Sequence, residues 1–135
     1  MKTDGPETLS KILADSRSGD NMTRVNAIPE LGRYVDYRSA RERLEEIMLN
    51  DEIVTMRVDA AEQLARCGGE RGLLAVLNEL GRRHNEPDVD YIAYCLYELD
   101  ASGELPIIDI ITAVQGDLSS DGSVGFEDLK RLRGQ

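Results

Sequence analysis

A ten-residue segment of this chain recurs 33 positions later with the same order of residue types. Residues 24–33 read RVNAIPELGR, residues 57–66 read RVDAAEQLAR, and a fainter third copy covers residues 91–99. In the second copy the apolar residues, Val58 and Leu64 among them, form one stripe at helical spacing. The repeat therefore predicts similar amphipathic helices that bury their stripes against neighbouring helices.

Other helical patterns alternate with these copies. They cover residues 8–16, 39–50, 70–83 and 105–116. Glycines at positions 68, 69 and 103 follow two of the copies, as expected where helices end. Pro29 falls inside the first copy and predicts a kink or a later helix start. We expect helix pairs throughout one domain spanning residues 1–135, and no strand.

Residues 51–68 resemble the second helix of a HEAT-like repeat. The matching features are Asp51-Glu52 in an acidic turn, Arg57-Val58 in inverted order, the Ala60-Ala61 pair, Leu64 and Gly68. The resemblance is good over residues 38–69, fair over residues 8–35 and weak over residues 70–116. It implies an all-α fold, a right-handed α-α superhelix (solenoid) of about four helix pairs. In that family the second helices line the concave face, which is the usual surface for partners.

The net charge of −10 is concentrated in one stretch. Residues 84–129 contain eleven carboxylates and no Lys or Arg, hence a net charge of −11. Such a field repels nucleic acid and anionic membranes and attracts a basic protein. The alternative is that the acidity only maintains solubility.

Several absences from the sequence point to a cytoplasmic protein. The chain has no stretch of apolar residues long enough to span a membrane, and residues 1–6 lack an apolar signal segment. Cys67 and Cys95 stand far apart in no metal-like spacing, so we interpret them as reduced core residues.

Polar and aromatic residues beside the apolar stripes are candidates for a partner surface. Tyr91, Tyr94 and Glu98 fall at i, i+3 and i+7, hence on one helix face. Tyrosine combines contact area with a polar tip, which suits an interface hot spot. The predicted partner-binding residues are Asp59, Glu62, Asp88, Asp90, Tyr91, Tyr94 and Glu98. The alternative is that one or two of the tyrosines pack between repeats.

Residues 117–128 resemble an EF-hand loop, including its dockerin-type relatives. Such a loop has oxygen ligands at positions 1, 3, 5, 7 and 12, and a glycine at position 6. Gly122 matches the glycine, and the candidate ligands are Asp117, Ser119, Asp121, Ser123 through its carbonyl, and Asp128. The resemblance implies a weak Ca²⁺ site inside the last helix pair. The alternative is an Asx-type turn that caps a helix beginning at Phe126.

The sequence predicts no catalytic residue and no required cofactor. The only histidine, His84, lies in a polar run and is interpreted as a solvated loop residue. No nucleophile motif, phosphate loop or zinc spacing is present.

We therefore predict a non-catalytic protein-binding module whose partner is basic. In its most concrete form it is an immunity protein that masks a cognate bacterial toxin with its acidic surface. This fits because many such toxins are basic nucleases and some immunity proteins are HEAT-like. Two alternatives remain open: an accessory or scaffold protein of an enzyme complex, similar to HEAT-like bilin-lyase relatives, and a calcium-responsive regulator.

Overall fold

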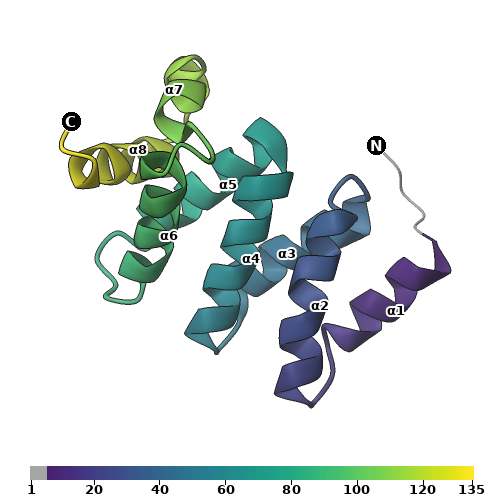
Figure 1. Ribbon diagram of the computed structural model, residues 1–135. Helices are drawn as coiled ribbons and strands as arrows, with labels where there is room; N and C mark the ends of the chain where they lie inside the picture. Colours follow the sequence, from purple (N-terminus) through teal and green to yellow (C-terminus); the bar gives the residue numbers. More distant parts are fainter. Residues whose placement is uncertain (1–5) are drawn as a thin grey trace. The chain divides into compact units, whose positions relative to one another are not determined.

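The computed structural model describes residues 6–135, and every regular element among them is a helix (Figure 1). This confirms the predicted all-α class. The chain divides into two compact units, residues 1–68 and residues 69–135. Residues 1–5, which hold most of the segment predicted to lack an export signal, lie outside the described residues.

The first unit contains four helices whose bounds follow the predicted patterns. They are α1 (Glu7–Asp15), α2 (Asn21–Arg33), α3 (Arg38–Asn50) and α4 (Val54–Cys67). Consecutive helices pack on one another, and α2 also lies along α4 (Figure 1). The buried stripes of these helices, including Leu31, Leu44 and Leu64, form the core of the unit.

Helix α2 begins at Asn21 although Pro29 lies inside it. Asp20 precedes the helix, and its carboxylate accepts hydrogen bonds from the Thr23 backbone N–H at 2.9 Å and the Thr23 hydroxyl at 2.7 Å. These bonds satisfy an otherwise unpaired donor of the first turn and lower the pKa of Asp20. The later helix start that Pro29 suggested is therefore wrong, because the cap fixes the start well before the proline.

Two arginines fasten the end of α1 to the rest of the first unit. Arg43 donates to the backbone oxygen and to the hydroxyl of the buried Ser16, each at 2.9 Å, and pairs with Glu46. Arg24 also donates to the Ser16 carbonyl, at 3.3 Å, and pairs with Asp51. The Ser16 carbonyl, directly after α1, thus accepts hydrogen bonds from two guanidinium groups. Positive charge is favourable at a helix C-terminus because the helix dipole is negative there.

The second unit is built around one long helix pair. Its elements are α5 (Gly69–Arg82), α6 (Val89–Ala101), α7 (Ile107–Thr112), the 3₁₀ turn η1 (Gln115–Asp117) and α8 (Ser120–Leu132). Helix α5 packs most extensively on α8, far more than on α6, which follows it in the chain. The repeat pattern led us to expect α5 to pair with α6, so the packing of this unit differs from that expectation.

Glycines bring α5 and α8 unusually close. A Cβ atom added at Gly81 of α5 would collide with the backbone carbonyl of Asp121, and one at Gly125 would collide with the carbonyl of Leu77. Gly122 is also buried, near the side chain of Asn78. Since only glycine lets two helix backbones approach this closely, these residues determine which helix covers α5.

The predicted EF-hand-like loop is corrected by the structure, because residues 120–128 are helical. Ser119 is the N-cap of α8, and its hydroxyl accepts from the Gly122 backbone N–H at 2.9 Å. Ser123 donates its backbone N–H to the Ser119 carbonyl at 2.9 Å, in the first turn. The helix that was expected from Phe126 onward therefore begins six residues earlier, at Ser120. Close packing on α5 and the serine cap compensate for the low helix propensity of two glycines.

Candidate partner-binding surface and pocket

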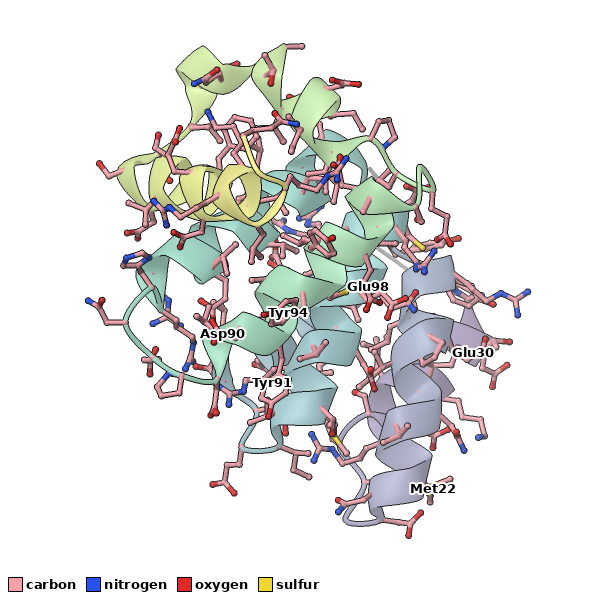
Figure 2. All side chains as sticks on the ribbon, turned by 60° about the vertical axis from the view of Figure 1, so that its left-hand side comes forward. Met22, Glu30, Asp90, Tyr91, Tyr94 and Glu98 are labelled. Atoms are coloured by element: carbon pink, nitrogen blue, oxygen red, sulfur yellow. The ribbon has the colours of Figure 1, made fainter. Side chains whose placement is uncertain are left out.

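Helix α6 separates its side chains into a buried and an exposed face. Val89, Ile92 and Leu96 are buried, whereas Tyr91 is 61% exposed and Tyr94 is 55% exposed. Asp90 and Glu98 are exposed too, and Figure 2 shows these four labelled residues along the helix. We call Asp90, Tyr91, Tyr94 and Glu98 the α6 strip. Large aromatic side chains are usually more buried than this, so the exposure of Tyr91 and Tyr94 makes them available for contact with a partner.

The carboxylates of the α6 strip are not used in ion pairs within the described part of the chain. Among residues 6–135, no cationic side chain forms an ion pair with Asp90 or Glu98. Five Lys and Arg side chains of the second unit pair with carboxylates outside the strip: Arg82 and Arg83 with Glu79, Lys130 with Glu127, Arg131 with Asp128, and Arg133 with Asp100. The unit contains thirteen carboxylates and six Lys or Arg, hence a net charge of −7.

Asp59 and Glu62, the other predicted partner-binding carboxylates, belong to the first unit. Both lie on α4 and are half-buried. Burial raises the pKa of Asp59, and the negative charge of Glu62 raises it further. Glu62 accepts a hydrogen bond from Arg66 Nε at 2.7 Å. The predicted set is thus divided between the units: Asp59 and Glu62 lie in one, and the remaining five residues, including the exposed Asp88, lie in the other.

A pocket of about 240 Å³ lies beside the α6 strip, within the second unit. Its apolar wall consists of Leu80 from α5, Val89 and Ala93 from α6, and Leu132 from α8. Its polar rim is formed by His84, Asp90, Asp128 and Arg131. Asp90 therefore belongs to both the α6 strip and the pocket.

The rim of the pocket is held by a chain of three polar residues. His84 Nδ1 lies 2.7 Å from Asp128 Oδ2, and Arg131 donates to the other carboxylate oxygen, Oδ1, at 3.0 Å. Asp128 is mostly buried, whereas His84 and Arg131 are exposed. The contact with Asp128 orients the imidazole ring of His84. The other ring nitrogen of His84, Nε2, is not used in this contact.

The loop between α5 and α6 is anchored where it leaves α5, and this places His84. The buried Glu79 carboxylate accepts from Arg82 Nε at 2.8 Å and from Arg83 Nε at 2.5 Å. The His84 backbone N–H donates to the Gly81 carbonyl at 3.2 Å. The interpretation of His84 as a purely solvated loop residue missed its contact with Asp128, which lies 44 positions away.

The five predicted calcium ligands do not form the loop that the sequence predicted. Asp117 lies in η1, Ser119 caps α8, Asp121 and Ser123 lie in the first turns of α8, and Asp128 holds His84. Within residues 6–135, no three or more His, Cys, Asp or Glu side chains gather in a group able to hold a metal ion. The structure therefore does not bring these five residues together around one point.

Comparison of the chain with protein-family models, curated proteins and solved structures gave no match. In the part of the chain that the structure describes, no helix has the length and apolar character needed to cross a membrane.

Proposed function

We propose that the chain is a non-catalytic binding module for a basic protein, and that this partner is a bacterial toxin which the chain neutralises in the cytoplasm as an immunity protein. The observation that supports this is the α6 strip, where two tyrosines are more than half exposed between carboxylates that form no ion pair with any residue from 6 to 135. Exposed aromatic residues are enriched at the energetic centres of protein interfaces.

The proposed mechanism is steric masking aided by charge. A nuclease toxin needs Lys and Arg to hold the phosphate backbone of its substrate. The same cations would be attracted to the α6 strip and to the −7 charge of the second unit. Long-range attraction would speed the encounter, and burial of the tyrosines would slow dissociation.

We also propose that the first unit consists of two HEAT-like repeats, α1–α2 and α3–α4. The packing of α2 along α4 supports this, because equivalent helices of neighbouring repeats stack in a solenoid. The proposal of stacked repeats covers the first unit alone, because α5 of the second unit packs mainly on α8.

The test is to look for a basic toxin domain encoded immediately upstream, mix that domain with the purified chain, and measure complex formation and residual toxin activity. We expect a stoichiometric complex and loss of activity. The double variant Y91A/Y94A should weaken affinity by at least about 100-fold, the effect of losing two modest hot spots. Failure to obtain either a complex or protection would reject the immunity function, and capture of a metabolic enzyme would favour the scaffold alternative.

Met22 offers a matched control for the tyrosine variants. It lies on α2 in the first unit, where Figure 2 labels it. Its exposed fraction of 65% is close to the 61% of Tyr91. We expect Met22→Ala to leave affinity unchanged. Equal weakening by Met22→Ala and by Y91A/Y94A would show that the α6 strip has no special role.

A further inference from the structure

The pocket beside the α6 strip has the size and lining of a receptor for one side chain. Its volume of about 240 Å³ lies below the range of about 300–1,000 Å³ that drug-sized ligands occupy. Four apolar side chains, from Leu80, Val89, Ala93 and Leu132, form its wall. Leu132 is 38% exposed at the end of α8, so part of this apolar wall is open to solvent.

Contacts among three rim residues hold one side of the pocket in place. Asp128 binds His84 and Arg131 with its two oxygens and so joins the α5–α6 loop to α8. A pocket whose wall is already ordered loses little conformational entropy when a side chain enters it. Asp90 lies on the same rim without an ion pair among residues 6–135 and offers a negative charge to whatever flanks that side chain.

We infer that this pocket is an anchor site for an aliphatic side chain of leucine size, presented by the basic partner on a segment in which Lys or Arg flanks it. The inference rests on the proposed function and adds the recognised chemistry to it. The apolar wall selects the aliphatic side chain, and Asp90 together with the net charge of the unit selects the flanking cations. Tyr91 and Tyr94, each next in the chain to a pocket residue, cover the segment alongside.

The experiment titrates the full chain with two synthetic peptides and follows its backbone amide signals by NMR. One peptide has a leucine flanked on each side by two lysines, and the other has alanine in place of the leucine. We expect the leucine peptide to bind about tenfold more tightly, because burying its side chain contributes transfer free energy that alanine lacks. It should shift the amides of Ala93 and Leu132, whereas the alanine peptide should shift those of the α6 strip alone.

Two matched variants of α8 test whether the preference for the leucine peptide arises in the pocket. Leu132 and Val124 are both 38% exposed on this helix, but only Leu132 lines the pocket. Leu132→Ser should remove most of the leucine preference, and Val124→Ser should leave it unchanged. The comparison of the two peptides on the unaltered chain tests the inference even if a variant unfolds.

The outcomes separate this inference from the proposed function. Equal binding of both peptides, with shifts confined to the α6 strip, would overturn the anchor pocket and leave the acidic binding surface in place. Binding of neither peptide at low salt would overturn the recognition of basic segments and hence both proposals. A dimer of the chain that Leu132→Ser dissociates would overturn the inference in favour of a second copy as the occupant.

Discussion

Asp59 lies on α4, where its side chain is half-buried and close to the carboxylate of Glu62. Burial and the neighbouring negative charge both make its ionisation less favourable. Burial, and then the charge of Glu62, raise the pKa of Asp59 in the folded chain. A raised folded pKa means that the folded state binds this proton more tightly than the unfolded state. The carboxylate therefore destabilises the fold as the pH rises through its folded pKa, and has no effect below the unfolded value, where both states are protonated.

We predict that Asp59→Asn increases the free energy of unfolding at neutral pH. The gain should be below about 0.5 kcal/mol, because water screens a group that is partly exposed. It should shrink to zero as the pH falls below the ordinary pKa of Asp, near 3.8. Urea unfolding at several pH values measures it, with Asp36→Asn at an exposed position as the control for lost charge. A gain that persists at low pH would contradict the explanation from ionisation.

Ser119 has two competing interpretations, as a helix cap and as a calcium ligand. As the N-cap of α8 it accepts from the Gly122 N–H, so we expect Ser119→Ala to cost about 1 kcal/mol of stability. Ser119→Asp should retain most of that stability, since aspartate caps equally well. Thermal unfolding with and without millimolar Ca²⁺ distinguishes the roles. If Ca²⁺ stabilised the chain and the double variant D117N/D121N abolished that effect, the calcium-responsive alternative would be supported instead.

At the scale of elements, the crossing of α5 and α8 depends on glycines. A Cβ at position 125 would meet the carbonyl of Leu77, a backbone atom that cannot rotate away. We predict that Gly125→Ala lowers the free energy of unfolding by about 1–3 kcal/mol, because overpacking outweighs the gain in helix propensity. Gly116→Ala is the matched control, since a Cβ there meets nothing within 4 Å.

Denaturant unfolding of these two variants gives a clear contrast. Gly116→Ala should leave the midpoint unchanged or raise it slightly, because alanine restricts the unfolded chain more than glycine does. Equal stability of Gly125→Ala and the unaltered chain would mean that α8 does not cross α5 at this glycine.

The helices that were predictable from sequence are those with a continuous buried stripe. Leu44 and Ile47 of α3, or Leu73 and Leu77 of α5, recur at helical spacing, and the structure buries all four. The start of α8 was not predictable in this way. Its first turns contain Gly122 and Gly125, whose low helix propensity indicates a loop. Packing on α5, which is distant in sequence, favours the helix there together with the Ser119 cap.

The candidate site was predictable only where it lies along one helix. The spacing of Tyr91 and Tyr94 placed them on one face of α6, and the structure confirms that this face is exposed. The pocket was missed because its wall comes from three helices, and because the His84–Asp128 contact joins residues that sequence order keeps far apart. The strong packing of α5 on α8, which is not local in sequence, brings these residues together.

At the scale of the whole molecule, the division at residue 68 implies two separately stabilised cores. The first has Leu31, Leu44 and Leu64 at its centre, and the second has Leu77 and Phe126, all fully or almost fully buried. We predict that fragments 1–68 and 69–135 each retain a helical circular dichroism spectrum and unfold cooperatively. Each should be less stable than the full chain, because a unit of this size buries a smaller fraction of its surface.

The second fragment provides the sharper test, because its core depends on the glycine crossing. Gly125→Ala should destabilise fragment 69–135 by the same amount as it destabilises the full chain, since the crossing lies wholly inside that unit. Fragment 1–68 does not contain residue 125, so its unfolding measures the stability of the first core alone. A fragment 69–135 that is unfolded when isolated would contradict the division, and it would mean that the acidic unit folds only when the first unit is covalently attached.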